Sequence, residues 1–440
     1  MKYYFVGIKG SGMTSLASIL KDLGNDVKGS DVSKSFFTDQ ILQSKDISFE
    51  SFESEIDLDT DQIILGNVHN FDHPQVIDAQ SKDIDVIRYY DKLNELMQTK
   101  QSIAISGTNG KTTTTSLLSQ ALTHKQPTYL VGDGHGFGNK DSNLFIFEAC
   151  EYKETFLNYT PDILIINNIE MDHPDFFKNL EDVISLFQKF ANKANKLFIN
   201  MDDENSLQIK ENNNNIYYFS LKNKEANLYL EVLDTNKDGV NFNLYYNQEL
   251  LGNYSSPLYG EYMLYNAMSC ILVGLTLNED IDTLIKNISS FKGAKRRFEE
   301  YKLSDSTILI DDYAHHPTAI ELTIKAIRQK YPDYKIYTIF QAHTYSRVIE
   351  FKDEFINTLN TSDFVYVIDI FGSVREQNSK VSSKVLIEGI DKNKVFDNLN
   401  FINKDEKKVI ALLGAGDIDK IYIPQIKQLF GELWLPLKNY

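Results

Sequence analysis

Cysteine and positive charge are both scarce in this sequence. Only Cys150 and Cys270 occur among 440 residues, which argues against a disulfide framework and favours a cytoplasmic protein. Lysine and arginine number 45 against 62 aspartates and glutamates, so the formal net charge is −17. Proteins that bind nucleic-acid backbones are usually basic, and we therefore expect no nucleic-acid partner.

Long apolar runs are missing as well. No stretch approaches the roughly 20 apolar residues of a membrane span, and the first residues lack the basic and apolar regions of a signal peptide. We therefore expect no membrane insertion and no targeting segment. A zinc site is disfavoured, because the sequence holds no cysteine cluster and no His-Glu-x-x-His spacing.

Apolar β-rich runs alternate with helical stretches along the whole chain, which predicts an α/β protein with mainly parallel sheets. We expect three domains. They are a Rossmann-like N-terminal domain over 1–97, a central P-loop ATPase-like α/β domain over 98–298, and a C-terminal Rossmann-like α/β domain over 299–440. Short alternating runs between 228 and 255 predict an antiparallel insertion.

The stretch GTNGKTT links an apolar strand to a threonine-rich helix start. Its glycines let backbone N–H groups approach phosphate oxygens, and a helix N-terminus favours negative charge. We expect Lys111 to lie against the β- and γ-phosphates of a nucleotide, and the Thr112 hydroxyl to ligate Mg²⁺. A chance glycine turn with a surface lysine is the alternative. The predicted nucleotide-binding residues are Gly107, Thr108, Asn109, Gly110, Lys111, Thr112 and Thr113.

Polar side chains follow the next two apolar strands. Glu148 and Glu151 come after the first of these strands, and Asn168, Asp172 and His173 come after the second. The carboxyl ends of parallel strands face the ligand crevice of an open sheet, and Mg²⁺ prefers oxygen ligands. We expect a metal or phosphate role for this edge, with a structural His173 as the alternative.

An earlier glycine loop, GIKGSG, follows the first apolar strand. Gly7, Gly10 and Gly12 give a G-x-x-G-x-G spacing, and Asp31 follows about twenty residues later, where nucleotide folds often place an acid against a ribose. We expect this loop to accept a diphosphate. A redox dinucleotide is the second possibility, but a dehydrogenase does not need the ATP-type loop that the chain also holds.

Basic and acidic residues gather near the third predicted domain. Arg296 and Arg297 lie at the junction, where an arginine could stabilise charge on a transferring phosphoryl group or simply form a solvated turn. Four later strand ends carry polar or glycine loops, and we expect them to form one face that binds a carboxylate-bearing substrate. The residues of these four strand-end loops are Asp311, Asp312, His315, His316, His343, Arg347, Arg375, Glu376, Gly414, Gly416 and Asp417.

Together these motifs resemble the Mur ligase family of peptidoglycan synthesis. The stretches that carry the likeness are FVGIKGSGM, GTNGKTTTT, FEACEY, GAKRRF, DDYAHHPT and FQAHTYSR, in the family's domain order over nearly the whole chain. The resemblance implies an ATP- and Mg²⁺-dependent ligase. Within the family these stretches are most similar to members that join L-alanine to the carboxylate of UDP-N-acetylmuramate through an acyl phosphate. The resemblance also implies that the substrates are small molecules and that the protein is a monomer or weak dimer.

The resemblance also implies roles for individual residues. Lys111, Glu148, His173, Arg297 and His343 would serve catalysis, and Thr112, Glu148 and His173 would ligate the metal ion. Asn266, Arg297 and Asp311 would join the glycine loop in binding ATP. The UDP-sugar would contact Gly7, Gly10, Ser11, Gly12, Met13 and Asp31. The amino acid would contact His316, His343 and Arg347.

Four positions depart from the family pattern: Asn109, Tyr262, Met263 and Ala342 stand where other residues are usual. None of them is the phosphate lysine or one of the basic residues of the amino-acid site, so we expect an active enzyme. Three other interpretations stay open at this point. They are a recycling ligase that attaches a tripeptide to UDP-N-acetylmuramate, a catalytically silent nucleotide-sugar-binding protein, and a nicotinamide oxidoreductase.

Overall fold

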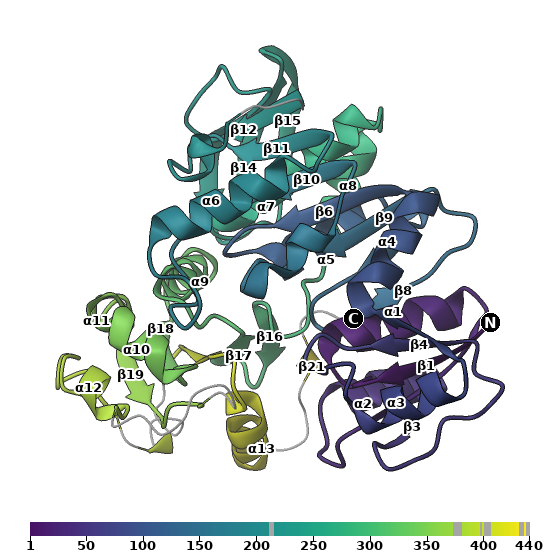
Figure 1. The fold of residues 1–440 in the computed structure, drawn as a ribbon. Coiled ribbons are helices and arrows are strands. Elements are labelled where there is room, and N and C mark those ends of the chain that lie inside the picture. Colours follow the sequence, from purple (N-terminus) through teal and green to yellow (C-terminus); the bar gives the residue numbers. More distant parts are fainter. Residues whose placement is uncertain (211–214, 373–380, 397, 400–405, 431–434, 437–440) are drawn as a thin grey trace. The chain divides into compact units, whose positions relative to one another are not determined.

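The computed structural model describes all residues except 211–214, 373–380, 397, 400–405, 431–434 and 437–440. The chain divides into two compact units, whose helices and strands are labelled in Figure 1. Unit 1 contains Met1–Ile169, Val183–Asn227 and Ala267–Ile288, and unit 2 contains Glu170–Asp182, Leu228–Asn266 and Ser289–Tyr440.

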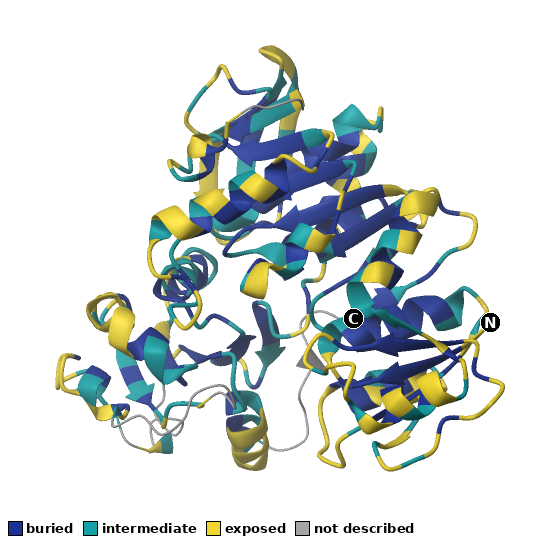
Figure 2. Ribbon diagram, viewed as in Figure 1, coloured by how far each residue is buried: buried dark blue, intermediate teal, exposed yellow. Residues whose placement is uncertain are grey.

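Unit 1 begins with a five-stranded parallel sheet in the order β3-β2-β1-β4-β5. The apolar central strand is buried along most of its length, as expected for a parallel sheet covered on both faces (Figure 2). The strands are β1 (Lys2–Val6), β2 (Asp26–Asp31), β3 (Ser48–Ser51), β4 (Gln62–Leu65) and β5 (Asp85–Arg88). The helices are α1 (Ser11–Asp22), α2 (Thr38–Ser44), α3 (Pro74–Ser81) and α4 (Tyr89–Thr99).

A second sheet in unit 1 has the order β12-β11-β10-β6-β9-β7-β8 and is parallel except for the pair β7–β8. Its strands are β6 (Gln101–Ser106), β7 (Thr128–Leu130), β8 (Gly136–Phe137), β9 (Leu144–Glu148), β10 (Ile163–Ile166), β11 (Lys196–Asn200) and β12 (Asn215–Ser220). The helices that follow or flank them are α5 (Lys111–Ala121), α6 (Leu180–Ala191), α7 (Glu261–Thr276) and α8 (Ile281–Ser289), of which α6 and α7 have their first residues in unit 2. Three short 3₁₀ helices are Thr123–Lys125, Tyr152–Asn158 and Ser206–Gln208.

The two sheets of unit 1 are tied together by α1. This helix contacts β7 and β8, and the Ser15 hydroxyl donates to the backbone oxygen of Val131 at 2.9 Å. A Cβ at Gly136 would lie 2.1 Å from the backbone oxygen of Ser15, so only glycine allows the helix to approach this closely. The first glycine loop is therefore anchored to the second sheet through its own helix.

Unit 2 holds a six-stranded sheet in the order β19-β18-β20-β17-β16-β21, in which only β16 pairs antiparallel with its neighbours. The strands are β16 (Glu299–Lys302), β17 (Thr307–Asp312), β18 (Lys335–Phe340), β19 (Phe364–Val367), β20 (Lys408–Leu413) and β21 (Leu435–Pro436). The helices are α9 (Pro317–Lys330), α10 (Tyr345–Glu350), α11 (Lys352–Leu359), α12 (Lys384–Ile387) and α13 (Ile418–Phe430). Buried side chains form clusters on both faces of this sheet.

The antiparallel insertion is confirmed. It consists of β13 (Leu228–Asn236), β14 (Gly239–Tyr246) and β15 (Glu249–Ser256), paired in succession within unit 2. The predicted α/β class with mainly parallel sheets is also confirmed. Within the part of the chain that the structure describes, no helix is long and apolar enough to cross a membrane.

Candidate active site

The loop 107–110 lies between β6 and α5, as the sequence predicts for a phosphate-binding loop. Gly110 caps α5 with φ of 82° and Gly107 has φ of 132°, a range that side chains other than glycine rarely adopt. Asn167 and Asn168, which follow directly after β10, hold the loop. Asn168 accepts from the backbone N–H groups of Thr108 and Asn109, at 3.0 and 2.8 Å.

Asn167 adds a second contact from the same strand end. Its side-chain amide donates to Thr114 Oγ1 at 3.0 Å and is within 3.3 Å of the backbone oxygen of Asn109. Sequence reasoning placed Asn168 at this edge but missed Asn167. The strand-end position was the available signal, and the loop-holding role of both residues required the fold.

Lys111 is buried over the loop that precedes it. Its ammonium group donates to the backbone oxygens of Gly107 and Thr108, at 2.6 and 3.1 Å, and forms an ion pair with Glu151 at 2.9 Å. Burial alone would lower the pKa of Lys111, but the attraction of Glu151 and the nearby Glu148 outweighs burial and raises it to about 12. The lysine is therefore a fixed positive charge beside the backbone of the loop.

Glu148 ends β9 and points toward the start of α5. Its Oε2 accepts from the Thr112 hydroxyl and from the Gly132 backbone N–H, both at 2.9 Å. A hydroxyl and a carboxylate so close together are oxygen donors of the kind that Mg²⁺ prefers, and the residues present fit that ion. Among the described residues, no group of three or more His, Cys, Asp and Glu side chains is arranged so that it could hold a metal ion.

The first glycine loop follows β1 and caps α1. Gly7 donates its N–H to the Ser30 backbone oxygen at 2.9 Å, and the carboxylate of Asp31 accepts from the Lys9 backbone N–H at 2.7 Å. A Cβ at Gly12 would lie 2.8 Å from the Tyr89 hydroxyl. The structure thus places Asp31 against the glycine loop, where it braces the backbone.

Lys9 in this loop was missed by sequence reasoning. Its buried ammonium group donates to the backbone oxygens of Val32 and Lys34, both at 3.0 Å, and lies 3.6 Å from Asp39. It also lies 4.7 Å from the centre of the Phe49 ring. These contacts show Lys9 joining the loop to the segment after β2.

In unit 2, both of the adjacent arginines at the start of the third sheet lie over the Tyr313 ring, Arg296 at 5.4 Å. Arg296 donates to the backbone oxygens of Gly414 and Gly416, at 2.7 and 3.0 Å, and lies 3.3 Å from the Asp311 carboxylate. Arg297 lies over the Tyr313 ring at 4.8 Å.

Asp311 is buried at the end of β17. Burial raises the pKa of Asp311 to about 7, against the attraction of Arg296 and with the repulsion of Asp419, Glu299 and Asp312. Asp417, in the glycine loop after β20, accepts from the Gln341 side chain at 2.8 Å.

The predicted amino-acid residues meet in unit 2. Arg347 forms a buried ion pair with Asp172 at 2.6 Å and donates to the His343 backbone oxygen at 3.1 Å. His316 Nε2 is 3.2 Å from the Met171 backbone oxygen. Burial opposes ionisation of Asp172, but Arg347 holds the pKa of that carboxyl well below its usual range.

His173 and Asn266 also belong to unit 2. His173 lies beside Asp172, with Nε2 at 3.9 Å from Oδ2, and has φ of 53°. Asn266 is buried, and its side-chain nitrogen lies 3.9 Å from the Met263 sulfur. The predicted residues Arg375 and Glu376 lie outside the described residues.

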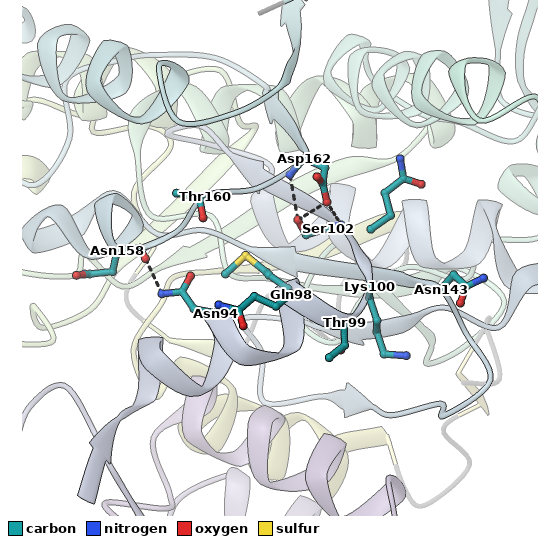
Figure 3. Close-up of a pocket in the computed structure, with 11 residues that line it drawn as sticks. Asn94, Gln98, Thr99, Lys100, Ser102, Asn143, Asn158, Thr160 and Asp162 are labelled. Carbon is teal, nitrogen blue, oxygen red and sulfur yellow. Dashed lines mark hydrogen bonds between the residues drawn. The ribbon is translucent and has the colours of Figure 1, made fainter.

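A separate hollow of about 960 Å³ lies at the other end of the second sheet of unit 1 (Figure 3). Its walls include Asn94, Lys100, Ser102, Asn158 and Asp162. Asn94 donates to the Asn158 backbone oxygen, and the Ser102 hydroxyl donates to Asp162. None of the predicted site residues lines this hollow.

Comparison with protein families gives three matches along the chain. Residues 2–101 match the model described as Mur ligase family, catalytic domain. Residues 105–274 match the Mur ligase middle domain, and residues 296–420 match the Mur ligase glutamate ligase domain.

Individual relatives are similar over the same length. The chain is 40% identical over 432 residues to a UDP-N-acetylmuramate–L-alanine ligase of Lactiplantibacillus plantarum, covering 97% of this chain and 99% of that one. Among solved structures, a UDP-N-acetylmuramate-alanine ligase of Thermotoga maritima gives a TM-score of 0.79 at 22% identity, covering 98% and 100% of the two chains. A murein peptide ligase of Psychrobacter arcticus gives 0.69 at 20% identity, covering 98% and 99%. At these identities the two structures establish a shared fold.

Proposed function

The chain belongs to the Mur ligase family, and on that premise we propose that it joins L-alanine to the carboxylate of UDP-N-acetylmuramate with consumption of ATP. The products are UDP-N-acetylmuramoyl-L-alanine, ADP and phosphate, and the reaction serves peptidoglycan precursor synthesis. The observation that carries this proposal is the 40% identity to an L-alanine ligase over 97% of the chain. The constellation of Lys111, Thr112 and Glu148 supports it chemically.

Amide formation from a carboxylate in water is uphill, so the carboxylate must first be activated. The muramoyl carboxylate attacks the γ-phosphate of ATP in line, and ADP leaves. Lys111 and Arg297 stabilise the charge on the transferring phosphoryl group. The lysine is well prepared for this role, because its ammonium group is already fixed beside the loop by Gly107 and Glu151.

The residues proposed to hold Mg²⁺ are Thr112, Glu148 and His173. When bound, the ion supplies positive charge that neutralises the β- and γ-phosphate oxygens. The chain's own contribution is to orient Glu148, whose carboxylate is fixed by the Thr112 hydroxyl and the Gly132 N–H. The adenine is proposed to contact Asn266, and Asp311 to meet the nucleotide from the third domain.

The second half of the reaction uses the acyl phosphate formed in the first. The neutral amine of L-alanine attacks the acyl carbon, and the tetrahedral intermediate expels phosphate. Arg347 is proposed to bind the alanine carboxylate, with His316 and His343 beside it. A histidine suits the removal of the amine proton, because its ordinary pKa lies near 6.5.

The nucleotide sugar is proposed to occupy the first glycine loop. Gly7, Gly10, Ser11, Gly12 and Met13 would surround its diphosphate, and Asp31 would lie near the ribose. We further propose domain boundaries near residues 97 and 298 and a monomer or weak dimer in the cytoplasm, where both nucleotides are available.

Phosphate release tests the proposal directly. Purified protein with MgATP and UDP-N-acetylmuramate is offered a panel of free amino acids and the murein tripeptide. We expect turnover with L-alanine above every other amine. Turnover with the tripeptide and none with L-alanine would refute the proposal in favour of a recycling ligase. No turnover with any amine would indicate a silent binding protein.

Chemical trapping tests the activated intermediate. With L-alanine withheld and hydroxylamine added, we expect the hydroxamate of UDP-N-acetylmuramate, identified by mass spectrometry. Its absence under conditions in which L-alanine is turned over would contradict the acyl-phosphate step.

A further inference from the structure

Arg347 is the proposed partner of the alanine carboxylate, but its guanidinium is already engaged within unit 2. Nε and Nη2 both donate to Oδ1 of Asp172, at 3.0 and 2.6 Å, and Nη1 donates to the His343 backbone oxygen at 3.1 Å. The exposed fractions of Arg347 and Asp172 are 3% and 7%. The two side chains therefore form a buried, hydrogen-bonded ion pair.

A buried ion pair is weak evidence for stability, because the loss of hydration can cancel the attraction between the charges. Its clear effect is geometric. The guanidinium carries five N–H donors in one plane, and contacts on Nε, Nη2 and Nη1 fix that plane. One donor on Nη2 is not used by these contacts, and the second donor on Nη1 has only a long contact, 3.5 Å to His343 Nδ1. Such a pair is what arginine uses to bind a carboxylate in bidentate fashion.

Aromatic rings support the same group. His343 Nδ1 lies 3.5 Å from Nη1 of Arg347, at the long limit of a hydrogen bond. The His343 ring stacks on Phe371 with centroids 5.8 Å apart and meets the edge of His315 at 5.9 Å. Arg347 is therefore held on one edge by a carboxylate and on another by a histidine whose own ring is packed.

The two partners come from distant parts of the sequence. Asp172 lies in the segment that matches the middle domain of the family, and Arg347 lies in the segment that matches the glutamate ligase domain. Asp172 also directly precedes His173, a proposed metal ligand. An effect of Asp172 on the amino acid must therefore be separated from an effect on the metal.

We propose that Asp172 is a positioning residue for the amino-acid substrate, which holds the Arg347 guanidinium so that its outer edge, formed by Nη1 and Nη2, meets the carboxylate of L-alanine. This inference rests on the proposed ligase function and on the role of Arg347 in it. Asp172 itself makes no contact with substrate in this scheme, and it acts only through the orientation of the arginine.

The test compares L-alanine with L-alaninamide, which keeps the attacking amine and lacks the carboxylate. For each enzyme the quantity measured is kcat/KM for alanine divided by kcat/KM for alaninamide, by phosphate release at saturating MgATP and UDP-N-acetylmuramate. Defects in ATP binding, metal binding or folding affect both amines and cancel in this ratio. We expect Asp172→Asn to lower the ratio about tenfold or more, because the orientation of a charged bidentate contact is lost.

Three further variants serve as controls. Glu181→Gln removes one negative charge from an exposed position in the same segment, and its ratio should equal that of the wild type. Arg347→Lys keeps the positive charge but loses the planar set of guanidinium donors, and its ratio should fall at least as far as that of Asp172→Asn. Asp172→Glu keeps the carboxylate one methylene further out and should give an intermediate ratio. This variant decides the question if Asp172→Asn does not fold.

Each outcome bears on a definite statement. A wild-type enzyme that does not use L-alanine refutes the proposed function, and the inference falls with it. An active wild type whose ratio is unchanged in Asp172→Asn, or in Asp172→Glu if only that variant folds, refutes the positioning role alone. Equal losses with both amines, accompanied by a higher Mg²⁺ requirement, would assign Asp172 to His173 instead. A lower KM for alanine in Asp172→Asn would show that the carboxylate competes with the substrate, which also overturns the inference.

Discussion

Gly132 offers a sharp test of the position of Glu148. A Cβ at this glycine would lie 2.4 Å from Oε2, 2.6 Å from Cδ and 2.7 Å from Oε1 of Glu148. An ordinary contact needs 3.4 Å or more, so Gly132→Ala must displace the carboxylate by roughly 1 Å. The φ of Gly132 is not in the left-handed region, so the backbone accepts alanine and the effect falls on the carboxylate.

The size of the effect follows from the tolerance of a magnesium site. Mg²⁺–oxygen distances vary by about 0.2 Å around 2.0–2.1 Å, so a shift of about 1 Å would remove Glu148 from the ligand position proposed for it. Misplacement on this scale costs about 100-fold in rate, and we expect that loss in kcat/KM for ATP. The free energy of unfolding should change little, because the atoms that move are the carboxylate atoms at the end of the flexible Glu148 side chain. The two hydrogen bonds at stake contribute about 1 kcal/mol each.

The assay is phosphate release as a function of Mg²⁺ concentration, with thermal unfolding measured in parallel. We expect a higher Mg²⁺ requirement, a lower maximal rate and an unfolding midpoint within a few degrees of the wild type. Glu148→Gln is the reference variant, because the carboxylate on which Gly132→Ala is expected to act is already absent from it. If Gly132 acts through Glu148, adding Gly132→Ala to Glu148→Gln should cost little more. Wild-type kinetics in Gly132→Ala, or fully additive losses in the double variant, would refute the reasoning.

The other predictions concern lysine, arginine and aspartate. Lys111→Ala should reduce ATP-dependent phosphate release by at least about 1,000-fold while calorimetric binding of UDP-N-acetylmuramate persists, and substantial turnover would contradict the loop assignment. Arg347→Lys should raise the KM for alanine at least about tenfold and leave that for ATP nearly unchanged, whereas equal effects would argue against an amino-acid role. Burial raises the pKa of Asp311 from 3.8 to about 7, so the folded state retains a proton that the unfolded chain releases. The contribution of Asp311 to the free energy of unfolding is therefore fully present below about pH 4. It is lost as pH rises through 7, which lowers the free energy of unfolding by at most about 4 kcal/mol. Asp311→Asn should gain stability relative to the wild type across that window in denaturant titrations, and parallel pH curves would contradict the assignment.

Local features of the fold could be predicted from the sequence. The strand, glycine loop and helix around Lys111 are contiguous, so their order alone predicts a phosphate-binding arrangement. Glu148 could be placed because it ends an apolar strand of a parallel sheet. Strands β2 and β3 were not recognised, because their sequences DVKGSD and SFES are largely polar. Packing explains why β2 has a glycine where an apolar side chain would be expected. A Cβ at Gly29 would come within 2.4 Å of the Phe5 backbone oxygen on the neighbouring strand.

Contacts between distant residues could not be predicted. The sequence singled out both Glu151 and Lys111 but could not pair them across 40 positions. It also could not tell which of two adjacent arginines faces Asp311, since Arg296 and Arg297 have the same chemistry and differ only in backbone direction. In the structure Arg296 lies 3.3 Å from that carboxylate, and the phosphate role of Arg297 stays a prediction.

Unit 1 is assembled from three separate stretches of chain, and this has a consequence during synthesis on the ribosome. The helix that follows the nucleotide loop receives a contact from the Cys270 thiol to the Thr114 backbone oxygen at 3.7 Å, across 156 positions. Asn287 reaches the far end of the same helix, at 3.0 Å from the Ala121 backbone oxygen. At translation rates of about 5–20 residues per second, a nascent chain waits roughly 10–30 s between making this helix and making its last partners. A nascent polypeptide that stops before α7 therefore carries the nucleotide loop without the neighbours that complete it.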